Sequence, residues 1–321
     1  MRILRGEDLQ KLLDPPTLIN AIAEAFALYS EGKTITPPRT VMWIEGNWWG
    51  VMQSYVPSYG VGVKVVNIVP TNVERGLPTI NAVALLLDPE TGRPLALLDG
   101  NVLTGLRTAA ACALSVKLMA PENRGTLTIV GTGYQARFIL RFVATVFIIE
   151  QLKLFDADPR RAESFASFAR VQGFENVVVC RSLEEALRSS TVVIESTTAT
   201  EPVIRRRFLT PPTHVVSIGV RGPRFSTVDP ETVADSEIVA VDSRQAVLEE
   251  VADIRVPLEM GLITEDRIVE IGEIVRGRKR GRIGRGITLF KSVGLAVQDA
   301  VAASLAYRRA IERGVGVEIE L

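Results

Sequence analysis

Hydrophobic positions are spaced differently in successive parts of the chain. In residues 1–32 they recur at helical intervals, Pro15-Pro16 is a helix-start signal and Gly32 is a helix-end signal. We therefore predict a helix over this segment. In residues 39–98, short apolar runs are interrupted by Gly, Pro and Asn, which predicts a mostly antiparallel sheet.

From residue 126 onward, strand-like and helix-like segments alternate. Apolar runs predict strands over 126–130, 151–156, 176–180, 191–196, 213–218 and 237–241. Helical spacing predicts helices over 134–147, 159–171, 182–189 and 243–252. Such alternation is typical of a doubly wound parallel sheet with helices on both faces, the Rossmann arrangement.

Two further helices flank this region. One is predicted over 103–119, and a long one over 293–313. Because the last helix follows the alternating region, we expect it to return to the first domain. The predicted fold class is α/β: a Rossmann doubly wound parallel sheet, residues 120–293, inserted into a discontinuous α+β domain formed by 1–119 and 294–321.

Composition and charge exclude several functional classes. The 321 residues are 47% hydrophobic and 23% charged, and 37 basic side chains balance 37 acidic ones, so we expect no nucleic-acid partner. The basic run over 276–285 is interpreted as a solvated loop. The apolar run over 142–149 is the longest candidate for a membrane-spanning segment, and it falls short of the ~20 residues that such a segment needs. We therefore expect no membrane partner.

Cysteine and histidine usage narrows the chemistry further. Cys112 and Cys180 lack metal-ligand spacing, and no apolar leader follows Met1, so we expect reduced thiols in a cytoplasmic protein. His214 is the single histidine, and its place at the start of an apolar run favours a core residue over a catalytic one. No metal site is expected.

A glycine-rich sequence follows the first strand of the alternating region. T-L-T-I-V-G-T-G-Y-Q-A places Gly131, Gly133 and Ala136 in G-x-G-x-x-A spacing. Gly131 allows a tight turn, Gly133 lets the backbone approach a pyrophosphate, and Ala136 keeps the helix close to the sheet. Because a strand precedes this sequence and a helix follows it, we predict a dinucleotide site rather than a turn that serves packing alone.

The next predicted strand ends in Asp156. A carboxylate at this position accepts hydrogen bonds from the adenosine ribose and repels a 2′-phosphate, which favours NAD over NADP. Arg160 and Arg161 follow closely and leave NADP as the weaker alternative.

Cationic side chains lie in apolar surroundings upstream of the glycine-rich sequence. Lys64 lies in V-G-V-K-V-V-N, and Arg107 lies where a loop is expected to enter the helix T-A-A-A-C-A. A buried cation needs a partner, and ligand carboxylates or phosphates are suitable ones. The alternative for Lys64 is an edge lysine whose ammonium group reaches solvent. Arg39, after T-P-P, either completes a carboxylate clamp or lies on the surface.

Several longer segments have uncommon sequences: G-V-K-V-V-N, R-G-L-P-T, L-L-D-P-E-T-G-R-P-L-A-L-L-D-G, L-T-G-L-R-T-A-A-A, V-G-T-G-Y-Q-A-R, S-T-T-A-T-E-P and T-L-F-K-S-V-G-L-A-V-Q-D. Together they resemble the ornithine cyclodeaminase and mu-crystallin family over nearly the whole chain. The resemblance implies that the discontinuous domain binds substrate and forms a homodimer. It also implies that the Rossmann domain binds NAD.

The resemblance implies roles for individual residues. It places the substrate carboxylate at Arg39, Lys64 and Arg107, and it places Val293 in the pocket lining. For the implied chemistry we expect Lys64 to be the catalytic residue, which handles the proton or polarises the substrate. The residues expected to contact the cofactor, including the glycines of the fingerprint, are Thr79, Arg107, Gly131, Gly133, Tyr134, Gln135, Asp156, Thr197, Gly219 and Ser292.

The implied activity is that of an NAD(H)-dependent oxidoreductase acting at the C–N centre of a small amino or imino acid, as in alanine dehydrogenases and ketimine reductases. Two alternatives stay open. One is an ornithine cyclodeaminase, which forms L-proline and ammonia with catalytic NAD; the other is a mu-crystallin-like NAD(P)H-binding protein with little turnover. Arg221 stands where the cyclodeaminases carry a proton-transferring aspartate, and no acidic group stands near Gly50–Gln53 to hold a distal amine. Since arginine keeps its proton near neutral pH, the first difference argues against cyclodeamination.

Overall fold

The computed structural model describes residues 1–219 and 222–320, and the chain divides into two compact units. Unit 1 is Met1–Ala110 with Leu295–Leu321, and unit 2 is Ala111–Gly294. We predicted the first boundary at residue 119, whereas the chain divides at Ala110, inside helix α3 (Gly100–Met119).

Unit 1 is built on a mixed sheet with the order β15-β1-β6-β5-β4-β3-β2, seven strands within the described residues. Strands β2 to β6 pair antiparallel in succession, which confirms the sheet predicted over 39–98, and β1 pairs parallel with β6. The strands of this sheet and its 3₁₀ helix are β1 Arg2–Leu4, β2 Thr40–Ile44, β3 Asn47–Val56, β4 Gly60–Ile68, η1 Pro70–Arg75, β5 Ile80–Leu87, β6 Pro94–Asp99 and β15 Val317–Glu318.

The segment predicted as one helix over 1–32 contains a strand and two helices. Strand β1 and helix α1 (Gly6–Leu12) precede helix α2 (Pro15–Ser30). Pro15 and Pro16 occupy the first positions of α2, where proline is tolerated, and the Asp14 carboxylate accepts the backbone N–H of Thr17 at 3.1 Å. A helix therefore starts anew at the prolines, while pairing with β6 holds β1 extended.

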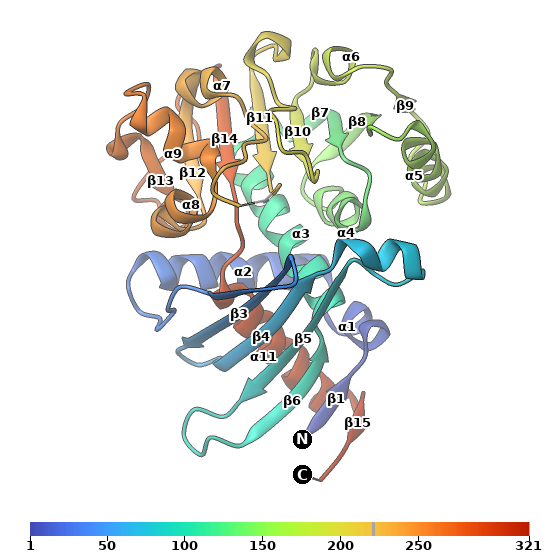
Figure 1. The fold of residues 1–321 in the computed structure, drawn as a ribbon, viewed down its shortest axis with the longest axis vertical. Coiled ribbons are helices and arrows are strands. Elements are labelled where there is room, and N and C mark those ends of the chain that lie inside the picture. Colours follow the sequence, from blue (N-terminus) through green and yellow to red (C-terminus); the bar gives the residue numbers. More distant parts are fainter. Residues whose placement is uncertain (220–221, 321) are drawn as a thin grey trace. The chain divides into compact units, whose positions relative to one another are not determined.

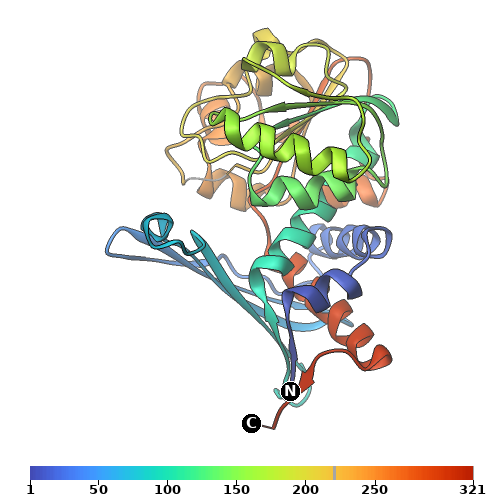
Figure 2. The same ribbon diagram turned by 90° about the vertical axis from the view of Figure 1, so that its right-hand side faces the viewer.

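Helix α11 (Ala296–Arg313) packs directly on the sheet of unit 1. It contacts β3 and β4, and α2 packs against it; Figure 2 shows both helices on the same side of the sheet. Gly62 of β4 permits this close packing, because a Cβ there would lie 2.6 Å from the Cα of Ala300. The last helix thus returns to the first unit, as predicted, and its first turn lies beside β4.

Unit 2 contains a parallel sheet with the order β13-β12-β14-β11-β10-β7-β8-β9, eight strands in the part of the chain that is described (Figure 1). All its neighbouring strands pair parallel, which confirms the doubly wound sheet. Its strands are β7 Arg124–Val130, β8 Ile148–Phe155, β9 Val177–Val179, β10 Val192–Glu195, β11 Thr213–Ser217, β12 Ser236–Val241, β13 Ile268–Glu270 and β14 Ile287–Lys291.

The helices of unit 2 follow its strands. They are α4 Tyr134–Val143, α5 Pro159–Val171, α6 Leu183–Leu187, η2 Arg206–Phe208, α7 Pro230–Asp235, α8 Arg244–Glu250, α9 Ala252–Glu259, η3 Glu265–Arg267 and α10 Ile271–Val275. Strands β13 and β14 and helices α9 and α10 were not predicted. The omission of β14 matters most, because it lies between β11 and β12 in the sheet.

Two surface and membrane expectations need correction. The basic run over 276–285 is mostly exposed, but Arg282 is half-buried and its guanidinium donates to the carbonyls of Met119 and Gly286.

Among the described residues, α3 is the one helix with the length and apolarity of a membrane span, with a mean hydropathy of 1.3, so the expectation that no stretch approaches this length is wrong. Because 78% of this stretch is buried inside the protein, α3 has the character of a core helix.

Candidate functional site

The glycine-rich loop joins β7 to α4 in unit 2. Gly131 has a φ of +88°, and a Cβ there would lie 2.8 Å from the carbonyl oxygen of Ser196, so the turn requires glycine. At Gly133, which caps the N-terminus of α4, an added Cβ would meet no protein atom within 4 Å. Ala136 is fully buried against the sheet. The loop therefore leaves open space at the start of a ten-residue helix.

The first residues of α4 present two side chains of the expected site. Tyr134 is 53% exposed and packs edge-on against Phe138, with 5.1 Å between ring centroids. Gln135 is half-buried, and in the described part of the chain its Oε1 is buried without a hydrogen-bond partner. A buried acceptor without a partner is costly in a folded protein, so a donor from a ligand fits this position.

Asp156 follows β8 and lies against the glycine-rich loop. Its Oδ2 accepts the backbone N–H of Thr132 at 2.8 Å and the Thr132 hydroxyl at 2.9 Å. Its Oδ1 accepts the N–H of Asp158 at 3.0 Å. A carboxylate offers about four acceptor positions, so capacity for a further donor is left. Arg160 is engaged by Asp158, with 3.2 Å between Nε and Oδ1.

Buried charges connect the ends of β10, β11 and β14. Glu195 accepts from the Thr197 hydroxyl at 2.6 Å and from the Gly219 N–H at 3.1 Å. Lys291 donates to the Gly219 carbonyl at 2.7 Å and forms an ion pair with Asp253 at 3.2 Å. Two residues expected at the cofactor, Thr197 and Gly219, are thus fixed by one carboxylate that sequence reasoning missed.

The segment that follows β14 is fixed by Asp242. Its Oδ2 accepts the Ser292 hydroxyl at 2.7 Å and the backbone N–H groups of Val293 and Gly294 at 2.9 and 2.7 Å. Ser292 and Val293 are buried. The expected cofactor residue Ser292 and pocket residue Val293 therefore lie in a rigidly held turn.

These features of unit 2 fit a dinucleotide. The pyrophosphate requires a tight glycine turn and open space at a helix N-terminus, and the adenosine ribose requires a carboxylate after the second strand. The buried acceptor at Gln135 offers a further contact to the ligand. The residues that would hold the group are Gly131, Gly133, Gln135 and Asp156.

In unit 1, Lys64 lies on the buried face of β4. Its side chain is 1% exposed, and its Nζ lies 2.8 Å from each carboxylate oxygen of Asp299, with hydrogen-bond geometry to Oδ1. Nζ also donates to the Thr104 hydroxyl at 3.3 Å. Strand β4 is central in its sheet, so the alternative of an edge lysine reaching solvent is wrong.

Arg107 shares the Asp299 carboxylate. Its Nε lies 3.1 Å from Oδ1 of Asp299, and its Nη1 donates to Oε1 of Gln298 at 3.2 Å. Because α3 begins at Gly100, Arg107 lies within the helix rather than at its entry, where the sequence had suggested it. Helices α3 and α11 thus bring their charges to one point beside β4.

The electrostatics of this cluster bring the pKa of Lys64 close to neutral pH. Burial and the charge of Arg107 lower the pKa of Lys64 from 10.5 to about 7, Asp299 opposes this change, and Arg39 adds to it. Burial raises the pKa of Asp299, yet the charges of Lys64 and Arg107 hold it below its usual range. Asp299 is therefore ionised at neutral pH, whereas Lys64 exchanges its proton there.

The remaining predicted residues lie as follows. Arg39 is half-buried in unit 1, where its charge reaches Lys64, so the three cations of the predicted clamp are brought together. Thr79 is half-buried just before β5, and its carbonyl accepts the N–H of Val69 at 2.8 Å. Arg221 lies outside the described residues.

His214 is a core residue of β11, as the sequence favoured. It is fully buried, and its ring nitrogens lie 2.9 Å from the Thr288 hydroxyl and 3.3 Å from the Ser115 hydroxyl. Burial and the charge of Arg282 lower the pKa of His214 to about 3, so the ring is neutral at physiological pH.

Sequence reasoning missed three buried charged residues. Asp299, Glu195 and the cation Lys291 each stand alone within an apolar run, A-V-Q-D-A-V, V-V-I-E and T-L-F-K. A charged residue in such a run must find a buried partner. A charged residue that interrupts an apolar run is the feature that singles out Lys64 and Arg107, and the same feature marks these three residues.

Comparisons with known proteins identify the family of this chain. The family model described as "Ornithine cyclodeaminase/mu-crystallin family" matches residues 3–314. The chain belongs to this family. A Delta(1)-pyrroline-2-carboxylate reductase of Bacillus cereus is 36% identical, with 100% of both chains covered.

Two solved structures of relatives share the fold. A Thermococcus litoralis Delta(1)-pyrroline-2-carboxylate reductase in complex with NADH and L-proline is 39% identical, covers 99% of this chain and 100% of its own, and has a TM-score of 0.94. An archaeal alanine dehydrogenase dimer with bound NAD is 33% identical, covers 100% of this chain and 99% of its own, and has a TM-score of 0.93. The resemblance of the sequence to the ornithine cyclodeaminase/mu-crystallin family is thereby confirmed.

Proposed function

We propose that this family member is an NADH-dependent reductase of a cyclic imino acid of the Δ1-pyrroline-2-carboxylate type. At the broader level it is an NAD(H)-dependent oxidoreductase that acts at the C–N centre of a small amino or imino acid. The observation that carries the proposal is Lys64, buried beside Arg107 with a pKa of about 7. A group that titrates near neutral pH is suited to general acid–base catalysis.

The charges of unit 1 suit a monocarboxylate with a reactive nitrogen. Arg39 and Arg107 carry two positive charges, and Lys64 adds a third when it is protonated, against the one negative charge of Asp299, so the cluster attracts an anionic substrate. Arginine presents a fork of donors that grips a carboxylate. The Arg39 and Arg107 guanidinium groups thus orient the substrate, and Lys64 exchanges the proton.

The proposed reaction adds one hydride to carbon and one proton to nitrogen across a C=N bond. When bound, the nicotinamide supplies the hydride to the α-carbon. Lys64 delivers the proton to the nitrogen in the direction of reduction and accepts it in the reverse direction. The guanidinium groups stay protonated throughout and contribute orientation and charge.

A second candidate is an alanine dehydrogenase. It is supported by the archaeal alanine dehydrogenase, whose sequence identity of 33% is close to that of the pyrroline-2-carboxylate reductases. The two activities share the carboxylate clamp and the proton exchange at Lys64. They differ in whether the imine is cyclic or is formed from a keto acid and ammonia.

Initial rates of NADH oxidation separate these activities. We expect rapid oxidation with Δ1-pyrroline-2-carboxylate and formation of L-proline, slower oxidation with pyruvate and ammonia, and no proline from L-ornithine. A faster rate with pyruvate and ammonia would replace the proposal by the alanine dehydrogenase. Proline formed from ornithine would establish the cyclodeaminase, and NADH binding without oxidation of any substrate would favour the binding protein.

We also propose that the protein is a homodimer through the hairpin of β2 and β3. All residues of β2 are exposed, among them Met42 and Trp43, which are 46% and 66% exposed. An exposed apolar patch of this kind marks an interaction surface. The archaeal alanine dehydrogenase is described as a dimer, which supports a second copy as the partner.

The cytoplasm is the proposed compartment. Cys180 is a free and buried thiol, and burial raises its pKa. Thiols that stay unpaired suit a reducing compartment.

A further inference from the structure

Lys64 and Arg107 share one buried carboxylate, Asp299, which contacts no other described cation. We propose that Asp299 is a positioning residue of this enzyme: it holds Lys64 and Arg107 at a fixed separation and supplies the negative charge that keeps a proton on Lys64. The inference rests on the proposed role of Lys64 as proton donor. Asp299 lies 2.8 Å from the Lys64 ammonium and 3.1 Å from the Arg107 guanidinium.

The sequence places Asp299 there through the packing of α11 on β4. Gly62 lets α11 approach at Ala300, so that the neighbouring Asp299 meets Lys64, two residues further along β4. Asp299 lies in the first turn of α11, where the helix dipole favours a negative charge. The preceding Gln298 accepts both the N–H of Leu295 at 2.8 Å and Nη1 of Arg107, which fixes this turn against α3.

The charges around Lys64 explain why the carboxylate is needed. Burial disfavours the charged ammonium, and the charges of Arg107 on α3 and of Arg39 before β2 add to that effect. Asp299 on α11 is the negative charge that opposes them. If this charge were lost, Lys64 would be neutral at physiological pH and would have no proton to give to an imine.

Two substitutions move the Lys64 titration in opposite directions. In Asp299→Asn, we expect the midpoint of Lys64 to fall by roughly 1 to 3 pH units, the usual effect of an adjacent charge. In Arg107→Gln, a cation is removed, and the midpoint should rise. Asp299→Glu keeps the charge and should stay near the wild-type value. The chain has seven lysines, so the ¹³Cε signal of Lys64 in lysine-labelled protein can be assigned with Lys64→Met.

The pH profile of the reaction gives the second measurement. Because the protonated form of Lys64 donates, kcat/KM for imine reduction should fall as the pH rises through the Lys64 midpoint, near 7 in the wild type. In Asp299→Asn the fall should move to lower pH, so that activity at pH 7 drops and recovers on acidification. The dissociation constant of NADH should stay unchanged.

The outcomes separate this inference from the proposed function. An unchanged Lys64 midpoint in folded Asp299→Asn, together with an unchanged pH profile, would contradict the role of Asp299. If Asp299→Asn does not fold, Arg107→Gln and Asp299→Glu test the charge balance instead: a Lys64 midpoint that does not rise in Arg107→Gln, or that moves far from the wild-type value in Asp299→Glu, would contradict the role of Asp299. A Lys64 midpoint that responds to Asp299 in a protein that reduces no imine would overturn the proposed reductase and with it the catalytic meaning of Asp299.

Discussion

Asp156 accepts hydrogen bonds from the glycine-rich loop, and it lies where we expect the adenosine ribose to bind. The sequence predicted it as the acidic residue after the second strand of the Rossmann domain, and the structure adds its hydrogen bonds to the N–H and hydroxyl of Thr132. A substitution of Asp156 therefore removes a charge and loosens the loop at once. The two effects can be separated, because Thr132→Val removes the hydroxyl contact and keeps the carboxylate.

Cofactor preference tests this assignment. In Asp156→Ser the repulsion of a 2′-phosphate is lost, so we expect the preference for NADH over NADPH to fall by about tenfold or more, since a hydrogen bond to a charged group contributes roughly 1.5–3 kcal/mol. Thr132→Val should weaken both cofactors alike. Dissociation constants from nicotinamide fluorescence provide the comparison. An unchanged ratio in Asp156→Ser would remove Asp156 from the ribose.

Sequence reasoning at the residue scale found the cations and missed their partner. Lys64 and Arg107 stand out because each interrupts an apolar run. Asp299 lies 235 positions after Lys64, and the two meet only because Gly62 lets α11 pack on β4. A contact of this separation depends on tertiary packing, which the local pattern of one sequence does not contain.

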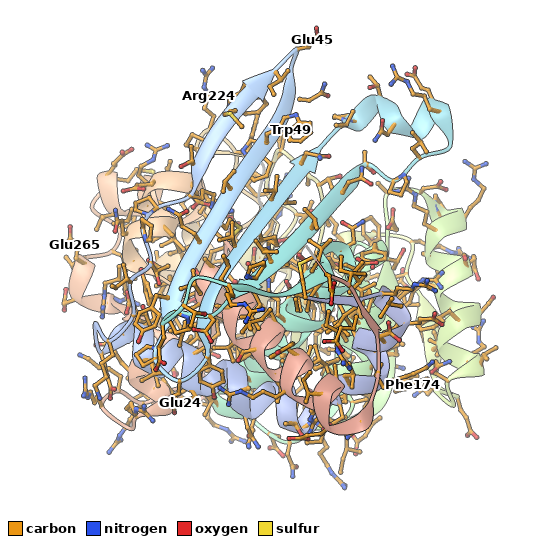
Figure 3. The ribbon with its side chains drawn as sticks, turned by 90° about the horizontal axis from the view of Figure 1, so that it is seen from below. Glu24, Glu45, Trp49, Phe174, Arg224 and Glu265 are labelled. Carbon is orange, nitrogen blue, oxygen red and sulfur yellow. The ribbon has the colours of Figure 1, made fainter. Side chains whose placement is uncertain are left out.

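The β2–β3 hairpin carries the exposed apolar side chains of Val41, Met42, Trp43 and Ile44 in unit 1. It turns at Glu45 and Gly46, both at positive φ, and Figure 3 shows Glu45 at its tip and Trp49 along it. The apolar runs predicted these strands. The alternation of side chains along a strand does not show that β2 is exposed, and it does not show which surface covers β2. By contrast, α11 is largely buried within the unit.

The mass of the protein in solution tests the hairpin as a dimer contact. Light scattering after size exclusion should give twice the 35.0 kDa of one chain for the wild type and the single-chain mass for Trp43→Asp. Val171→Asp is the matched control, because Val171 is 83% exposed in unit 2. A wild-type protein that runs as a single chain would refute the homodimer, and an unchanged dimer in Trp43→Asp would move the contact elsewhere.

At the scale of the whole molecule, the sequence predicted the two units. It did not predict strand β14, which leads from unit 2 toward the last helix. Alternating strands and helices with a glycine-rich loop predicted the Rossmann unit, and the flanking segments predicted the second unit. Strand β14 was missed because I-T-L-F-K directly follows the basic run over 276–285, which was interpreted as a solvated loop, although Gly284 and Gly286 mark a turn before it. Yet this strand carries Lys291 and leads into the turn held by Asp242.

The central claim is that unit 1 performs the proton chemistry on a substrate while unit 2 binds the cofactor. The most direct test is turnover and NADH affinity measured together in Lys64→Met. We expect the rate of imine reduction to fall by at least about 10²-fold, the usual contribution of a general acid, while the NADH dissociation constant stays within about twofold. Lys117→Met, at an exposed position of α3, is the control and should match the wild type. Unchanged turnover in Lys64→Met, or a parallel loss of NADH binding, would contradict the account.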